Sequence, residues 1–152
     1  MRITFSLSLP RDEASVPVVR HICRDALIGL GVERRCVAEV EVATSEACTN
    51  VLKHVAGTDD SYEVTVEVNE ARCEIRVIDT GHGFDHESLN ALGLSDVEGS
   101  AESGRGIFLM RAMVDQIKFL NEPETGTIVH LTKTLVLEPD SVLARFIPAE
   151  PV

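Results

Sequence analysis

The chain has 152 residues, a length at which a single domain can bury a sizeable core. Its 14 basic and 25 acidic residues give a formal net charge of −11, which argues against a protein that binds nucleic acid through a basic surface. No stretch approaches the roughly 18 apolar residues of a membrane span, and the first residues lack the pattern of a signal peptide. We therefore expect one cytoplasmic domain.

The first half of the chain predicts a strand, two helices and a hairpin. Residues 2–9 alternate polar and apolar side chains, as in a half-buried strand. Residues 16–30 and 33–55 repeat apolar side chains at helical spacing. Residues 62–69 and 73–78 alternate again, and the short connection between them favours a hairpin with one packed face.

The four cysteines are Cys23, Cys36, Cys48 and Cys73. None forms a Cys-x-x-Cys pair, and three lie in apolar, helical contexts, so their spacing does not favour a metal site. We expect reduced, buried thiols.

The helix predicted at 33–55 carries the first candidate site. Glu46 and Asn50 are four residues apart, so they share one side of the helix and flank its apolar stripe. A carboxylate and an amide at that boundary could share one hard cation or one ligand, and the carboxylate could also serve as a base. The alternative is a solvated glutamate beside an asparagine that bonds within the helix.

A second candidate site follows the strand at 73–78. Asp79 stands at the strand end, so its carboxylate projects from a rigid edge. Gly81 and Gly83 would let a ligand approach the backbone closely. Taken alone, this stretch could also be a simple turn.

The third candidate site is the glycine pair Gly104 and Gly106. The preceding residues, 85–103, are polar and lack a period, which favours a lid or a disordered segment. The glycines open a helix over about 104–114, and free amides at a helix start attract phosphate. The pattern is neither a P-loop nor a dinucleotide-binding fingerprint.

The end of the chain predicts two more strands and a tail. The strands are expected at 117–120 and 127–137 around a turn. The tail, 138–152, contains three prolines and is expected to be mobile or loosely packed.

In combination, the three sites resemble the N box, the DxGxG box and the GxGxxL box of the GHKL superfamily, which includes gyrase, MutL and histidine kinases. A closer resemblance is carried by Ser45-Glu-Ala-Cys-Thr-Asn50 with His54, and by the Leu-Met pair that ends the third box. These residues are similar to those of anti-sigma factor serine kinases of the RsbW and SpoIIAB type. The resemblance covers about residues 3–135.

The fold implied by this resemblance is the Bergerat fold, an α+β two-layer sandwich. Its sheet is mixed and mostly antiparallel, its helices pack on one face, and a lid covers the nucleotide. The kinase domain would span 1–137, with 138–152 as a C-terminal tail.

The resemblance also implies roles for individual residues. Glu46 would be the general base toward a protein serine hydroxyl, and Asn50 would hold the Mg²⁺ that bridges the ATP phosphates. Asp79 would accept a hydrogen bond from the adenine amino group. Further nucleotide contacts would come from His54, Gly81, Gly83, Gly104, Arg105, Gly106 and Ile107. Arg20 would contact protein partners, although together with Arg24 it also fits a solvated helix face.

The implied function is an anti-sigma factor that binds a sigma factor and uses ATP to phosphorylate a serine on an anti-anti-sigma (STAS) protein. Such proteins are homodimers, and no direct contact with nucleic acid or a membrane is expected. One alternative is a partner switch that binds nucleotide without useful catalysis. Another is a detached catalytic domain of a histidine kinase, which is disfavoured because such domains do not usually carry the Ser-Glu-Ala-Cys-Thr-Asn sequence.

Overall fold

Five strands form one antiparallel sheet. The computed structural model describes residues 1–54, 61–79, 103–122 and 126–146. The strands are β1 (Arg2–Pro10), β2 (Ser61–Asn69), β3 (Arg72–Asp79), β4 (Gln116–Glu122) and β5 (Gly126–Thr134). They lie in the order β1-β2-β3-β5-β4, and each pairing among these strands is antiparallel.

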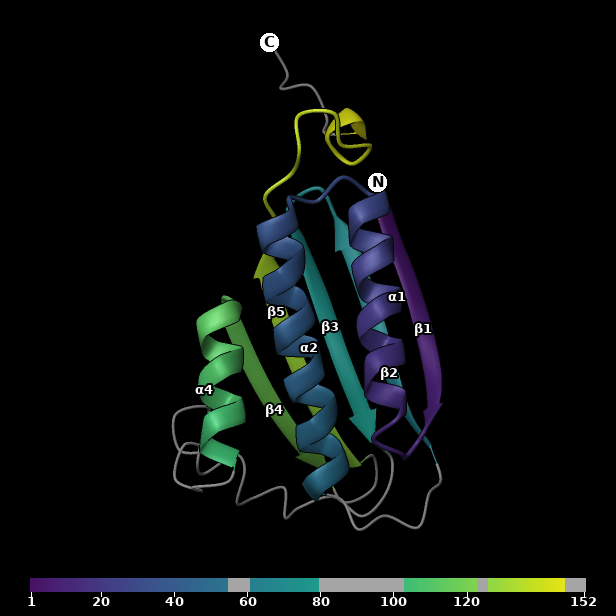
Figure 1. Ribbon diagram of the computed structural model, residues 1–152, viewed down its shortest axis with the longest axis vertical. Helices are drawn as coiled ribbons and strands as arrows, with labels where there is room; N and C mark the ends of the chain where they lie inside the picture. The colour runs from purple at the N-terminus through teal and green to yellow at the C-terminus, as the bar shows by residue number, and fades with distance from the viewer. Residues whose placement is uncertain (55–60, 80–102, 123–125, 147–152) are drawn as a thin grey trace.

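The α-helices of the described chain cover one face of this sheet. They are α1 (Ser15–Gly29), α2 (Arg34–His54) and α4 (Ser103–Met113), and α2 lies between the other two (Figure 1). The strand residues that point away from the helices, such as Thr65 and Arg76, stay partly exposed. The predicted α+β sandwich, with helices on one face of a mostly antiparallel sheet, is therefore confirmed.

The core is centred on α2, whose inward side consists of small and branched apolar residues. Val40, Ala43, Ala47 and Val51 are each 0% exposed and repeat at steps of three and four residues. The helix packs against β3 and β5 as well as against both neighbouring helices. Burial of a valine side chain contributes roughly 1.5–3 kcal/mol, so this stripe fixes how α2 is rotated against the sheet. That rotation in turn fixes where Glu46 and Asn50 lie.

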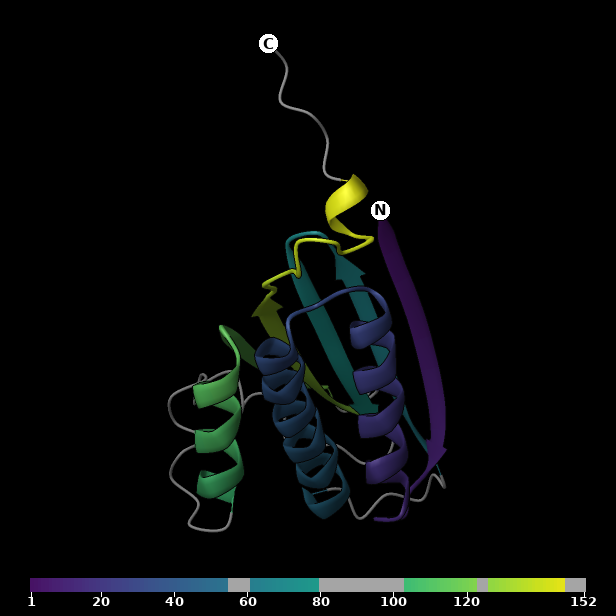
Figure 2. The same cartoon turned by 45° about the horizontal axis from the view of Figure 1, so that its top comes forward.

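The ends of several elements gather at one end of the sandwich. β3 and α2 both finish there, and α4 and β5 both begin there, as Figures 1 and 2 show from two directions. The described residues of the three candidate sites lie in or near these ends: Asn50 in the last turns of α2, Asp79 at the end of β3, and Gly104 at the start of α4. The antiparallel arrangement thus brings together segments that are 25 or more residues apart in the sequence.

The opposite end of the sandwich is closed by residues 135–146. The prediction of a strand to 137 is wrong, because β5 ends at Thr134, which pairs with Arg72, the first residue of β3. Beyond the strand, the Leu135 amide still donates to the carbonyl of Ala71 at 2.9 Å. The chain then turns to the loop between α1 and α2, where Leu137 forms a bridge with Val32.

The prediction of a loosely packed tail is wrong for the described residues 138–146. Leu143 is 0% exposed and belongs to the core, and a short 3-10 helix, η2 (Ala144–Phe146), follows it. The Ser141 hydroxyl donates to the carbonyl of Leu30 at 2.7 Å and accepts from the amide of Leu143 at 3.1 Å. Gly31 has a φ of 82°, and a Cβ atom there would lie 2.6 Å from the Ser141 Cα atom. Only glycine therefore fits at this junction.

All four cysteines are free and buried, as predicted. Burial raises the pKa of the Cys23 and Cys48 thiols to about 12, and it also raises the pKa of Cys36 and Cys73. These thiols are therefore protonated and unreactive in the folded protein.

No helix within the described ranges is long and apolar enough to cross a membrane.

Candidate functional site

Glu46 and Asn50 lie along one edge of α2, beside its buried stripe. Both side chains are half-buried, as expected for residues at the boundary between the core and the surface. The edge that they occupy faces α4, because the Glu46 carboxylate lies against Gly106 of that helix. Glu41, on the opposite edge of α2, instead pairs with Arg24 of α1. Glu46 thus faces α4, and Asn50 follows one turn later on the same edge of α2.

Gly106 allows the Glu46 carboxylate to come close to the backbone of α4. A Cβ atom built on Gly106 would lie 3.0 Å from the Glu46 Oε2 atom, closer than ordinary van der Waals contact. Any side chain at this position would therefore push the carboxylate away. Gly104 and Arg105 lie in the first turn of the same helix, where backbone amides lack intrahelical partners. The first and third predicted sites therefore adjoin, with a carboxylate beside a helix start that suits phosphate.

Asp79 is the last residue of β3 and is 0% exposed. Its Oδ2 atom lies 3.1 Å from the Nε atom of Arg11, which follows β1 in the sequence. A buried carboxylate is costly without an opposite charge, and Arg11 supplies one. Sequence reasoning did not find this partner, because nothing in the stretch around Arg11 distinguishes it from other surface arginines.

Thr127 is a second residue that sequence reasoning missed. It pairs directly opposite Asp79 in the register of β3 and β5, and it is 4% exposed. Its hydroxyl has no hydrogen-bond partner within the described part of the chain. A buried hydroxyl without a partner usually serves a ligand or an ordered water. A carboxylate and a hydroxyl side by side at a strand end can together recognise an amino group and a ring nitrogen.

A family model described as a histidine kinase-like ATPase domain matches residues 9–133 of this sequence. The chain belongs to this family. The matched segment runs from the end of β1 to β5, so it includes all three candidate sites.

Individual relatives show which branch of this family the chain most resembles. The sequence is 28% identical over 137 residues to the serine-protein kinase RsbW of Halalkalibacterium halodurans, covering 87% of this chain and 83% of that protein. It is 31% identical over 140 residues to RsbW of Listeria monocytogenes, covering 88% of each. A crystal structure of the RsbU and RsbW domains of a Mycobacterium tuberculosis protein has a similar fold, with a TM-score of 0.65 at 20% identity. That match covers 88% of this chain and 32% of the larger protein. The resemblance to the RsbW type is confirmed.

The remaining predicted residues of the ATPase domain are placed as follows. Ile107 is fully buried in the core, so its side chain serves packing. Arg20 is half-buried on α1, the helix on the other side of α2 from α4 (Figure 1). His54 ends α2, and its side chain lies outside the described part, as do Gly81, Gly83 and nearly all of the predicted lid at 85–103.

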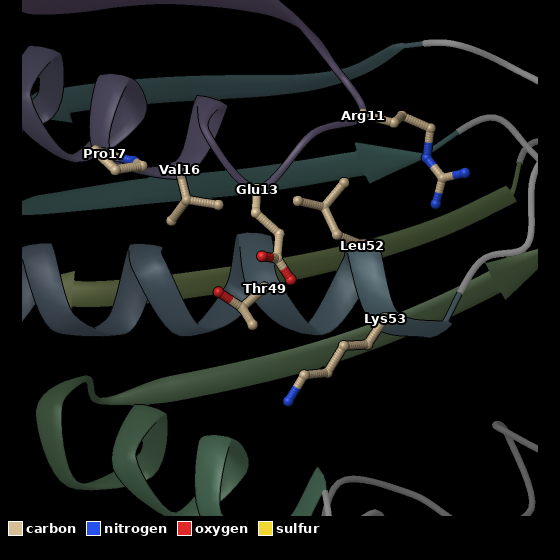
Figure 3. Close-up of a pocket in the computed structure, with 7 residues that line it drawn as sticks. All are labelled: Arg11, Glu13, Val16, Pro17, Thr49, Leu52 and Lys53. Atoms are coloured by element: carbon tan, nitrogen blue, oxygen red, sulfur yellow. The ribbon is translucent and has the colours of Figure 1, made fainter.

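A separate cleft of about 540 Å³ lies on the outer side of α2, near the start of α1. Figure 3 shows its lining residues, which come from the segment after β1, from α1 and from α2. They are Arg11, Glu13, Val16, Pro17, Thr49, Leu52 and Lys53. Glu13 extends from the β1–α1 connection toward Thr49 of α2, whereas Arg11 extends toward the end of β3. Arg11 is therefore shared between this cleft and the Asp79 site.

The described residues contain no group of three or more His, Cys, Asp or Glu side chains that could hold a metal ion by themselves. Mg²⁺ fits such a site in another way, because it commonly binds one or two protein oxygens together with substrate phosphates and waters. Asn50 offers an uncharged oxygen one turn from Glu46, whose carboxylate lies against Gly106 near the start of α4. The donor set therefore fits a Mg²⁺ ion that arrives with its nucleotide.

Proposed function

We propose that this protein is an ATP-dependent serine kinase that acts as an anti-sigma factor in a partner-switching circuit. It would bind a sigma factor and phosphorylate a serine on a STAS-domain protein, working as a homodimer. The observation that carries the proposal is the contact of Glu46 with Gly106, which puts a carboxylate beside a glycine-led helix start. The names of its RsbW relatives support the same reaction.

Each residue of the site has a role in this proposal. Asp79 would accept from the adenine amino group, with Thr127 beside it. Asn50 would hold Mg²⁺, which when bound neutralises phosphate charge. The amides that open α4 would bind phosphate oxygens. The proposal also includes the nucleotide contacts of His54, Gly81, Gly83, Arg105 and the main chain of Ile107, and the partner contact of Arg20.

Glu46 would act as the general base. Its carboxylate takes the proton of the serine hydroxyl as the serine oxygen bonds to the γ-phosphorus of ATP. The bond between that phosphorus and the bridging oxygen breaks, and ADP leaves. A positioned base typically contributes a factor of about 10²–10⁴ to the rate.

The test is phosphate transfer from ATP to candidate STAS-domain proteins, with phosphoserine identified by mass spectrometry. Glu46→Gln keeps the size of the side chain and removes the base, so we expect transfer to fall about 100-fold while ATP still binds. Glu41→Gln is the matched control, because it removes a carboxylate from the opposite edge of the same helix.

Three results would contradict parts of this proposal. Transfer by Glu46→Gln at the wild-type rate would exclude Glu46 as the base. Binding of ATP and partners without any phosphoserine would favour a switch that works without catalysis. Phosphohistidine on a partner would instead indicate a histidine kinase.

A further inference from the structure

The ion pair between Arg11 and Asp79 links two segments that lie far apart in the sheet. Arg11 follows β1 and Asp79 ends β3, and β2 lies between these strands. The Arg11 side chain is 12% exposed and the Asp79 side chain 0% exposed. We infer that Arg11 is a positioning residue that sets the Asp79 carboxylate for recognition of the amino group of adenine. This inference rests on the proposed function, because it takes Asp79 as the adenine contact.

The two neighbours of Asp79 approach it from opposite sides. Arg11 comes from the β1 and β2 side of β3, whereas Thr127 belongs to β5 on the other side. The contact of Glu46 with Gly106 also lies on the β5 and β4 side, where α4 packs beside α2 (Figure 1). A nucleotide that reaches from this contact to Asp79 would meet Thr127 on its own side, with Arg11 behind the carboxylate.

Contact with Arg11 restricts the orientation of the carboxylate. Rotation of the carboxylate plane would move Oδ2 away from the guanidinium and weaken an ion pair in a buried setting. The direction of the lone pairs that accept a hydrogen bond is then set before a ligand arrives. Such preorganisation improves binding because the ligand does not have to order the group itself.

The charge of Arg11 favours its position beside Asp79. The same side chain also borders the cleft of about 540 Å³ near the start of α1 (Figure 3). Glutamine reaches about as far as the Nε atom of arginine and carries no charge. Arg11→Gln should therefore weaken the electrostatic hold on the Asp79 carboxylate.

The experiment compares ATP with purine riboside triphosphate, which has the same sugar and phosphates but lacks the 6-amino group. Affinities are measured by calorimetry for the full chain and for Arg11→Gln, Arg11→Lys and Asp79→Asn. Arg24→Gln is the matched control, because Arg24 also pairs with a carboxylate, Glu41, but at a surface 48% exposed. Thermal melting checks that each variant is folded.

We expect wild type to prefer ATP, and Arg11→Gln to bind ATP about tenfold more weakly while its affinity for purine riboside triphosphate stays unchanged. Arg11→Lys should retain part of the preference, and Arg11→Gln should add nothing in the Asp79→Asn background. Equal weakening for both nucleotides, tighter ATP binding, or an unchanged preference would each overturn the inference. Failure of wild type to bind ATP would instead refute the proposed function.

Discussion

Gly106→Ala tests directly whether the position of the Glu46 carboxylate matters. The new Cβ atom would lie 3.0 Å from Oε2, so the carboxylate must retreat by about 0.4 Å to reach the 3.4 Å at which ordinary contact begins. The obstacle is the flexible end of a side chain, so the backbone need not move. Alanine is also favoured over glycine inside a helix by about 0.5–1 kcal/mol. The fold should therefore be kept while the Glu46 carboxylate, the proposed base, is displaced.

The expected effect on catalysis follows from that displacement. A misplacement of about 1 Å can cost roughly 100-fold in rate, so 0.4 Å corresponds to a loss of about tenfold in phosphate transfer at saturating ATP. The melting temperature should stay the same or rise by about 2–4 °C. The assays are single-turnover transfer to the STAS partner and thermal melting of the same samples.

Gly29→Ala provides the control for this prediction. Gly29 ends α1, and a Cβ atom there meets nothing within 4 Å. It should change stability in the same direction as Gly106→Ala and leave transfer unchanged. Wild-type transfer by Gly106→Ala would refute the idea that the Glu46 contact is part of the site. A large fall in melting temperature would show that Gly106 serves the fold instead.

Three further predictions concern stability and accessibility. Leu143→Ala should lower the free energy of unfolding by about 2–5 kcal/mol in urea titrations, because Leu143 is 0% exposed. ATP affinity should not change, and a parallel loss would contradict the separation of the two ends. Burial and the charge of Arg76 lower the pKa of His130 below its ordinary value of 6.5. As the pH falls, the unfolded chain takes up this proton before the folded chain does, so the free energy of unfolding decreases as the pH is lowered. His130→Gln should flatten this dependence in denaturation series between about pH 5 and 7. A thiol reagent should modify all four cysteines only after denaturation, and rapid reaction of the native protein would contradict their burial.

Periodicity predicted the parts of the fold that depend on local patterns. The stripe of Val40, Ala43, Ala47 and Val51 defined α2 and placed Glu46 and Asn50 at its edge. The alternation in β2 and β3 defined the hairpin. In the helix, buried residues recur every three or four positions, and in the strands they recur every second position.

Features that depend on long-range contacts were not predictable from such patterns. Asp79 was identified from its place after a strand, but its ion-pair partner Arg11 and its neighbour Thr127 come from the ends of other strands. Only the register of β3 with β5 reveals Thr127, and a single sequence does not determine register between distant strands. Leu143 was missed because prolines surround it and no period marks it.

The pairing of β1 has a consequence for the order of folding. Arg2 pairs with Asn69 and Pro10 with Ser61, so the connection between β1 and β2 contains both α1 and α2. The hairpins β2–β3 and β4–β5 close over short distances, whereas β1 can join only after a long loop has formed. During synthesis, β1 is therefore made first but joins the sheet late. Until β2 emerges, the unpaired backbone groups and the alternating apolar side chains of β1 are open to other chains.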